Sequence, residues 1–257
     1  MTKLNLRNLR QSEDAFVDEI FASSSLYGAP LLRALFPRAY VDVNREPWEL
    51  DSKMFFDPLP SYVKKKSPYI SAGLGTVPKT VGNGQKIYSQ KLSFLEVRNR
   101  ILEHYFPYHN ALKSLIKNAL AIHGTCLVID CHSMPSENKT PKSSEKYLPD
   151  IIIGDNHGTS CSSSVVERTV KVLESLGYSV GCNCPYAGGF ITKNYSNIQK
   201  GVHTMQIEIN RSLYMDEKTV ERSSKHLPLI NKFQTLIEEL SLMNIDKLEP
   251  KLGNSLL

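Results

Sequence analysis

The chain has 257 residues, of which 41% are hydrophobic and 22% charged, and its 14 Gly and 14 Pro are ordinary numbers for a globular protein. This composition excludes a coiled coil, a fibrous protein and an intrinsically disordered chain. The formal net charge is +5, but the basic residues are scattered. The one tight basic run, Lys64-Lys65-Lys66, is more typical of a solvated loop than of a phosphate-binding patch, so we expect no nucleic-acid partner.

The sequence contains no apolar run near the roughly 20 residues that a membrane-spanning helix requires. Residues 1–14 lack the apolar core of a signal peptide, and the five cysteines form no regular framework. These features predict a soluble, cytoplasmic protein without a membrane partner. The length suits a single domain over residues 1–257, in which about 246–257 form a frayed tail. The sequence leaves the oligomeric state open.

The first third of the chain predicts a helix, a strand and a long excursion. Residues 12–26 have the spacing of an amphipathic helix. Residues 39–45 alternate between apolar and polar side chains, which predicts a strand that delivers Asn44 and Arg45 at its end. Residues 57–92 are rich in Pro, Gly and Ser and predict a long excursion with short strands.

Two helices and a strand are expected next. The first helix begins at a capping box formed by Ser93 and Glu96, and we expect it to end or kink near Pro107. A second helix runs to about Ile122. A short apolar strand follows over residues 125–131.

The rest of the chain alternates between strand and helix signals. A helix is expected to be capped by Ser164 with Glu167 and to end at Gly177. The other expected elements are a polar loop, a buried strand, two further strands and a last helix, at 136–149, 151–153, 178–184, 202–209 and after Pro228. This alternation predicts an α/β domain whose sheet is covered on both faces.

Polar side chains follow the predicted strands at the points where the strands end. In an open α/β sheet, ligands bind in the crevice beyond the carboxyl ends of the strands. The polar clusters at these ends are therefore the candidates for a functional site. They are Asn44-Arg45, Asp130-Cys131-His132-Ser133, Asp155-Asn156-His157 and Glu208-Ile209-Asn210-Arg211.

His132 and Glu208 are the strongest individual candidates. A neutral imidazole at a strand end is a common zinc ligand, and Asp130 could orient the ring; the alternative is a partly buried His bonded to a loop. Alternation along its strand places Gln206 and Glu208 on one face. A buried carboxylate there either pairs with an Arg or serves as a general base. No short metal motif such as H-E-x-x-H occurs.

Three other side chains carry weaker signals. Arg45, beside Asn44, suits a bidentate clamp on a substrate carboxylate, or an ordinary ion pair with a neighbouring acid. His157 is a possible polar group in the cleft, although a His in a Gly-flanked loop is more often structural. Cys131 has no feature of an activated nucleophile and reads better as a small, buried apolar residue.

Several stretches together resemble the N-formylglutamate amidohydrolase family. They occur in the family's order and span most of the chain from about Asp14 to the last helix. The resemblance rests on FPRAYVDVNREPWELD (36–51), the turn at 73–78 with IYSQKL (87–92), PYH (107–109), VIDCHSMPS (128–136), GDNHGTSC (154–161), NCPYAGGFIT (183–192) and VHTMQIEINRSLYMDE (202–217).

The family is similar in fold to the zinc carboxypeptidases and aspartoacylases. The resemblance therefore implies a three-layer α/β/α domain around a mixed central sheet, and zinc-assisted hydrolysis of an amide. It implies that His132 is a zinc ligand, that Glu208 is the general base and acid, and that Asn44-Arg45 clamp a substrate carboxylate. By the same resemblance the pocket is shaped by Asn183, Tyr186 and the Gly188-Gly189 turn, and Arg211 either holds a second carboxylate or positions Glu208.

The function implied is a metal-dependent amidohydrolase that releases formate, or another small acyl group, from an N-acylated acidic amino acid such as N-formylglutamate. Family members usually begin with a strand ending in a Pro-His-Ser/Ala-Gly motif whose His is a zinc ligand, and no such motif precedes Asp14. Asp14 is a candidate further ligand by analogy, or a carboxylate favoured by a helix dipole. The alternative function is a catalytically impaired homologue that binds carboxylates.

Overall fold

The computed structural model describes residues 2, 4–82, 84–137 and 148–243, and these residues form two compact units. The first unit comprises the described residues of Met1–Ala15, Leu32–Lys113 and Lys218–Val220. The second comprises those of Phe16–Leu31, Ser114–Glu217 and Glu221–Leu257. Most of the predicted loop over 136–149, and the predicted tail, lie outside the described residues. The assignment of one domain to the whole chain stays a prediction.

The first unit consists of short helices joined by long connections. Its elements are α1 (Leu6–Arg10), η2 (Ser52–Met54), α3 (Pro68–Ser71), α4 (Phe94–Arg100), the π-helical turn η3 (Ile101–Tyr105) and the first part of α5 (Phe106–His123). Ser93 caps α4 as predicted, because its side chain accepts a hydrogen bond from the Leu95 N–H. The helical hydrogen bonds change to the π pattern just before Pro107, which lacks an N–H to donate.

The strand predicted over 39–45 is wrong. These residues form turns and irregular structure, and none of them belongs to a named strand. The side chain of Asp42 accepts the backbone N–H of Asn44 at 2.9 Å, and the Asp42 N–H donates to Thr76 O at 2.7 Å. Such a local side-chain bond competes with a sheet ladder, and it overrides the alternating pattern here.

The second unit contains a four-stranded mixed sheet in the order β1-β4-β2-β3. Its strands are β1 (Cys126–Met134), β2 (Ile151–Gly154), β3 (Val180–Cys182) and β4 (Val202–Asn210). β1 and β4 are parallel, β2 is antiparallel to β4, and β3 is parallel to β2. All residues of β2 and β4 are buried. This burial accounts for the continuous apolar run of β2, whereas apolar and polar side chains alternate over Met205–Asn210 of β4. The mixed central sheet predicted for this chain is confirmed.

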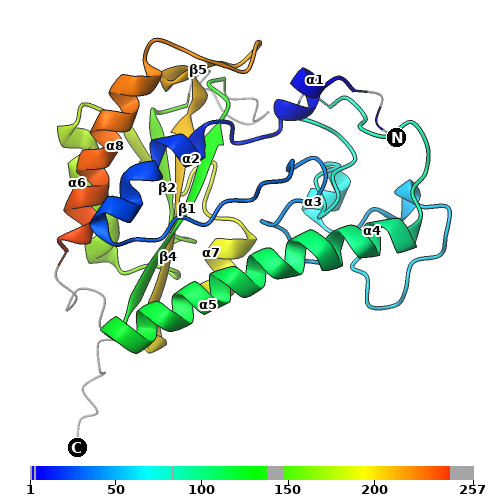
Figure 1. Ribbon diagram of the computed structural model, residues 1–257, viewed down its shortest axis with the longest axis horizontal. Coiled ribbons are helices and arrows are strands. Elements are labelled where there is room, and N and C mark those ends of the chain that lie inside the picture. Colours follow the sequence, from blue (N-terminus) through cyan, green and yellow to red (C-terminus); the bar gives the residue numbers. More distant parts are fainter. Residues whose placement is uncertain (1, 3, 83, 138–147, 244–257) are drawn as a thin grey trace, which may run out of the picture. The chain divides into compact units, whose positions relative to one another are not determined.

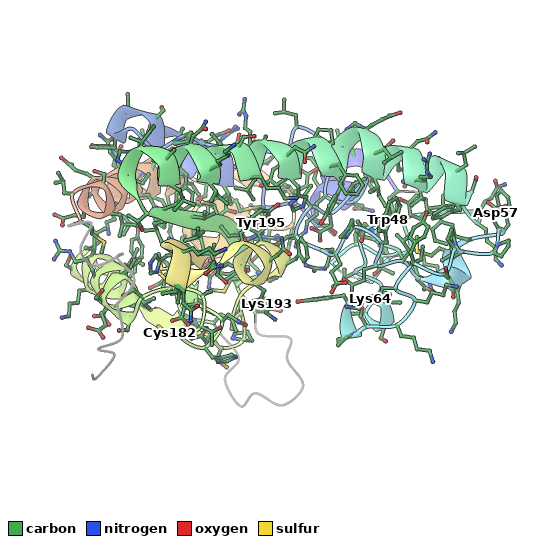
Figure 2. The ribbon with its side chains drawn as sticks, turned by 90° about the horizontal axis from the view of Figure 1, so that it is seen from below. Trp48, Asp57, Lys64, Cys182, Lys193 and Tyr195 are labelled. Atoms are coloured by element: carbon green, nitrogen blue, oxygen red, sulfur yellow. The ribbon has the colours of Figure 1, made fainter. Side chains whose placement is uncertain are left out.

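Helices cover both faces of this sheet. Figures 1 and 2 show α6 (Ser163–Ser175) and α8 (His226–Ser241) on one face, and α7 (Phe190–Tyr195) against the other. The α8 helix also packs on α2 (Val17–Ile20) and η1 (Ala22–Tyr27), where the Phe21 and Phe233 rings meet edge-on at 5.3 Å. The smaller elements of this unit are η4 (Ile198–Lys200), η5 (Arg211–Leu213), β5 (Met215–Asp216) and β6 (Glu221–Arg222).

Two helices differ from the sequence expectation. The single helix expected over 12–26 is broken at Phe16, whose φ of 66° lies in the left-handed region. The cap expected from Ser164 and Glu167 is also wrong, because α6 begins two residues earlier than that cap predicts, after Ser162. Within the described residues, every helix is too short or too polar to cross a membrane.

Candidate active site

Two neighbouring strands of the second unit place four polar side chains on one face of the sheet. The parallel register aligns Asp130 with Gln206 and His132 with Glu208. Side chains alternate along a strand, and aligned residues of neighbouring strands point to the same face, so all four share it. All four are buried, with exposed fractions of 4% to 9%.

Hydrogen bonds join these four side chains in two pairs. His132 Nε2 donates to Asp130 Oδ1 at 2.9 Å, which fixes the orientation of the imidazole. Gln206 Nε2 donates to Glu208 Oε1 at 2.6 Å. Gln206 Oε1 accepts the backbone N–H of Gly189 at 2.7 Å. The Gln206 amide therefore holds the Glu208 carboxylate on one side and the N-terminal end of α7 on the other.

The loop before α7 reaches the sheet through a glycine. Gly154, at the end of β2, pairs with Gln206 across the β2–β4 ladder. A Cβ atom at Gly154 would lie 2.8 to 2.9 Å from backbone atoms of Tyr186, Ala187 and Gly188. Only glycine admits the loop at this distance. The backbone of Tyr186 therefore lies beside Gly154, the β2 residue that pairs with Gln206.

A second group of polar residues links β2 to the connection after β3. Asn183 Oδ1 accepts the N–H groups of Asp155 at 3.1 Å and His157 at 3.2 Å, and Asn183 Nδ2 donates to Asp155 Oδ1 at 2.7 Å. The Asp155 carboxylate also accepts the Gly158 N–H at 2.9 Å. Asn183 and His157 both adopt left-handed backbone conformations, and His157 itself is exposed. Asn183 thus acts as a brace between two loops.

Arg211 follows β4 directly and reaches across to β1. Its Nε donates to Ser133 Oγ at 3.1 Å. The side chain of Asn210, the last residue of β4, accepts the Ser212 N–H and caps η5. Of the sequence candidates, the structure therefore brings together His132 and Glu208 within one face, with Asn183, Tyr186, His157 and Arg211 contributing to the adjoining loops of the same unit.

Asn44, Arg45 and Asp14 belong to the first unit. Both Asn44 and Arg45 are buried. Arg45 Nε donates to Leu74 O at 2.9 Å, and one terminal nitrogen donates to Asn44 O at 2.7 Å. Its guanidinium also stacks 4.0 Å from the centre of the Tyr69 ring. These contacts fix the guanidinium in one orientation.

Asp42 anchors the same cluster. Arg38 bridges two carboxylates, since its Nε lies 3.0 Å from Asp42 Oδ2 and its terminal nitrogen 3.0 Å from Asp14 Oδ2. Arg45 lies 3.8 Å from Asp42, which is the ion pair that the sequence left as an alternative. Burial alone would raise the pKa of Asp42, but Arg38, Arg45 and the Asn44 amide outweigh it and lower that pKa. Asp14 is therefore the partner of Arg38 in this structure.

The described residues do not form a complete zinc site. Within the described parts of the chain, no group of three or more His, Cys, Asp or Glu side chains is placed to hold a metal. Catalytic zinc sites take three protein ligands. His132 with Asp130 does not supply that set, and His132 Nε2 already donates to the Asp130 carboxylate. The role of His132 as a zinc ligand stays a prediction from the family resemblance.

The residues on the shared face of β1 and β4 lie within a stretch that matches a known protein family. The sequence model of the N-formylglutamate amidohydrolase family matches residues 1–215. That match includes both polar pairs and the loops that adjoin them. The chain belongs to this family.

Individual relatives agree with the family match. N-formylglutamate deformylase of Pseudomonas aeruginosa is 30% identical over 208 residues, covering 80% of this chain and 71% of the relative. The Pseudomonas putida enzyme of the same name is 30% identical over 207 residues, covering 79% and 71%. The family and these relatives are enzymes that hydrolyse a linear amide.

Solved structures support the fold. The crystal structure of N-formylglutamate amidohydrolase from Ralstonia eutropha superposes with a TM-score of 0.87 at 30% identity, covering 93% of this chain and 86% of that one. A protein from Agrobacterium tumefaciens is similar in fold alone, with a TM-score of 0.62 at 18% identity. The α/β class expected from the sequence is confirmed.

The sequence did not reveal two contributors to the site. Alternation placed Gln206 beside Glu208, but it did not show that the Gln206 amide bonds both Glu208 and Gly189. Asp155 was one of several polar residues at a strand end, and only the structure shows that Asn183 braces it. The contacts of Gln206 with Gly189 and of Asn183 with Asp155 join residues far apart in the sequence, and short-range patterns do not encode them.

Proposed function

We propose that this chain hydrolyses N-formylglutamate to formate and glutamate, with Glu208 as the proton-transferring residue. The observation that carries the proposal is the pairing of Asp130-His132 with Gln206-Glu208 on one buried face of β1 and β4. Membership of the N-formylglutamate amidohydrolase family and the names of the relatives supply the substrate. Asn44, Arg45, His157, Asn183, Tyr186 and Arg211 remain proposed as residues that bind substrate or shape its site.

In the proposed reaction, water attacks the formyl carbon, a new C–O bond forms and the C–N amide bond breaks. Glu208 accepts a proton from the attacking water and delivers it to the departing nitrogen. The Gln206 amide fixes the orientation of the carboxylate while this happens, and Asp130 fixes the imidazole of His132 beside it. Holding these groups in place before the substrate arrives reduces the reorganisation needed in the transition state.

Formate release from N-formylglutamate tests the proposal directly. The full chain is assayed with an enzyme-coupled formate readout, with and without added zinc. Glu208→Gln removes the proton acceptor while keeping the shape, so we expect kcat to fall by a factor of about 100 or more. Glu174→Gln, the same change at an exposed position of α6, is the matched control and should keep full activity.

Two results would contradict the proposal. One is an active Glu208→Gln variant. The other is a folded wild-type chain that releases no formate under any metal condition. If that inactive chain still bound N-formylglutamate saturably, as measured by calorimetry, the carboxylate-binding alternative would be favoured.

Zinc is tested separately. Metal analysis of the purified chain gives the stoichiometry, and His132→Ala asks whether this side chain contributes. Loss of zinc in the variant, with unchanged thermal unfolding, would support the predicted ligand. Equal zinc content in both proteins would contradict it.

A further inference from the structure

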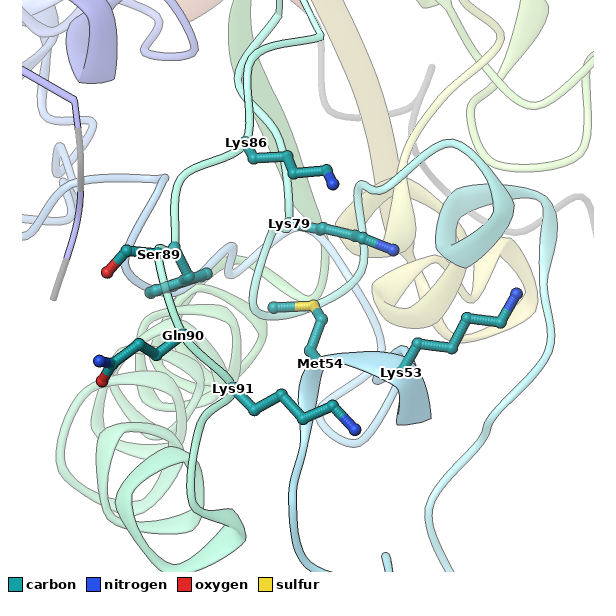
Figure 3. A pocket seen from close by; sticks show the side chains of 8 residues that line it. Lys53, Met54, Lys79, Lys86, Ser89, Gln90 and Lys91 are labelled. Carbon is teal, nitrogen blue, oxygen red and sulfur yellow. The ribbon is translucent and has the colours of Figure 1, made fainter.

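The first unit carries a pocket whose wall is formed largely by lysines. Its volume is about 230 Å³. Figure 3 shows the side chains of Lys53, Lys79, Lys86 and Lys91 around the pocket. The full lining comprises Lys53, Met54, Lys79, Lys86, Tyr88, Ser89, Gln90 and Lys91.

The backbone fixes where these lysines start. The Ile87 N–H donates to Lys79 O at 2.9 Å, and Thr80 pairs with Lys86 in an antiparallel bridge. These contacts place Lys79 and Lys86 on adjoining segments. Each pocket lysine is also next to a buried residue in the sequence. The four pairs are Lys53-Met54, Pro78-Lys79, Lys86-Ile87 and Lys91-Leu92.

A further backbone bond brings the remaining two lysines together. Leu92 N–H donates to Met54 O at 2.8 Å, and Phe55 pairs with Leu92 in a parallel bridge. The residues beside these bonds are Lys53 and Lys91. The side chains of all four lysines therefore start from backbone segments that hydrogen bonds hold together.

Positive charge in the pocket exceeds negative charge. Lys79 Nζ lies 2.9 Å from Asp51 Oδ2. Burial would raise the pKa of Asp51, but Lys79, the Lys53 N–H and the Lys53 charge outweigh it and lower that pKa. The segment 79–91 contains three lysines and no acidic residue. Among the described residues, no ion pair engages Lys53, Lys86 or Lys91.

We propose that this pocket binds a small phosphate-bearing anion with at least two negative charges, such as pyrophosphate or the diphosphate of a nucleotide. Ammonium groups act as point charges that suit phosphate oxygens, whereas planar recognition of a single carboxylate favours Arg. The volume is below the range of pockets for drug-sized ligands, which suits a diphosphate group. This site would be separate in chemistry from amide hydrolysis.

Isothermal titration calorimetry of the full chain with inorganic pyrophosphate tests the site. We expect saturable binding, with a Kd between about 10 µM and 1 mM, that weakens at higher NaCl. The Lys53→Gln/Lys86→Gln double variant should weaken binding at least about tenfold, because it removes two charge-assisted contacts. Lys113→Gln/Lys171→Gln removes the same charge from exposed positions of α5 and α6 and should bind as the wild type does.

Two further arms identify the ligand and its location. ADP binding tighter than pyrophosphate would assign the site to a nucleotide, and pyrophosphate binding tighter than ADP would assign it to an inorganic anion. Acetylation of lysines followed by mass spectrometry should show pyrophosphate protecting Lys53, Lys86 and Lys91. Absence of saturable binding, an unaffected double variant, protection only at other lysines, or equal affinity for N-formylglutamate would each overturn the proposal.

Discussion

The Gln206 amide makes two hydrogen bonds that a single substitution removes. It donates to Glu208 and accepts from Gly189. Gln206→Leu removes both bonds, so the Glu208 carboxylate loses its orientation while remaining present. We expect kcat for formate release to fall about tenfold or more with a smaller change in KM, and the free energy of unfolding to fall by about 1–3 kcal/mol.

A matched change and a conservative change sharpen this experiment. Gln199→Leu makes the same substitution at an exposed position of η4 and should leave both quantities near the wild-type values. Gln206→Glu keeps an acceptor for the Gly189 N–H but places a second carboxylate against Glu208. If Gln206→Leu lowered stability without changing kcat, Gln206 would be structural only.

The cysteines offer an independent test at the residue scale. Burial raises the pKa of the Cys161 thiol to about 12, and Asp155 adds to the shift. Cys182 and Cys184 are exposed, whereas Cys161 is buried. We expect iodoacetamide at about pH 8 to label Cys182 and Cys184 and to leave Cys161 unmodified until the chain unfolds. Labelling of Cys161 at the rate of Cys184, measured by mass spectrometry, would contradict this burial.

At the scale of elements, the end of β2 controls the loop before α7. Gly154→Ala places a methyl group less than 3.0 Å from backbone atoms of Tyr186, Ala187 and Gly188. Backbone cannot yield as a side chain can, so we expect a loss of about 1–3 kcal/mol in unfolding free energy. Activity should also fall, because movement of this loop displaces the Gly189 N–H from Gln206.

Gly82→Ala is the control for this substitution. Its added Cβ would meet only Gln11 O, at 3.6 Å, which is ordinary van der Waals contact. Urea unfolding and formate release measured on both variants give the comparison. Equal stability of Gly154→Ala and the wild type would show that the loop does not need the close approach.

The sequence predicted the elements whose signals are local. The apolar runs at the start of β1 and in β2, the alternation in β4 and the amphipathic pattern of α8 were found because strands and half-buried helices impose those patterns directly. The strand predicted over 39–45 is wrong because the Asp42 side chain accepts a hydrogen bond from the Asn44 N–H. A hydropathy pattern does not reveal such a bond. Position 42 shows that one polar side chain can override seven residues of alternation.

The candidate site was predicted in part. His132 and Glu208 were identified separately, from strand ends and from family motifs. Their alignment could not be predicted, because β4 lies between β1 and β2 in the sheet although β2 precedes it in the chain. The same applies to the Gln206 contact with Gly189, which joins a central strand to a loop. Strand order is a long-range property that these motifs do not specify.

For the molecule as a whole, carboxylates with lowered pKa values set the response to acid. Hydrogen bonding to Arg222 lowers the pKa of Glu19, while Arg38 and Lys79 do so for Asp42 and Asp51 against the effect of burial. Each group therefore stabilises the fold above its unfolded pKa, near 4, and this stabilisation is lost as the pH falls through the folded pKa. We expect the free energy of unfolding to fall between about pH 5 and pH 3.

Asp42→Asn tests whether Asp42 contributes to this fall in unfolding free energy at low pH. The variant cannot gain a proton at this position, so its unfolding free energy should fall less steeply over the same pH interval, although it is lower than that of the wild type at pH 7. Glu174→Gln, at an exposed position, should retain the wild-type slope. Chemical denaturation at several pH values measures all three proteins. Parallel curves for Asp42→Asn and the wild type would contradict the assignment.

The alignment of β1 with β4 also bears on synthesis of the chain. His132 leaves the ribosome well before Glu208, and β2, α6, β3 and α7 are all made between them. Until β4 emerges, β1 and β2 each lack the neighbour that separates them in the finished sheet. A nascent chain that stalls before Val202 would therefore expose two apolar strand edges and would contain no Glu208. His132 and Glu208 can be brought together on one face only after most of the polypeptide has been translated.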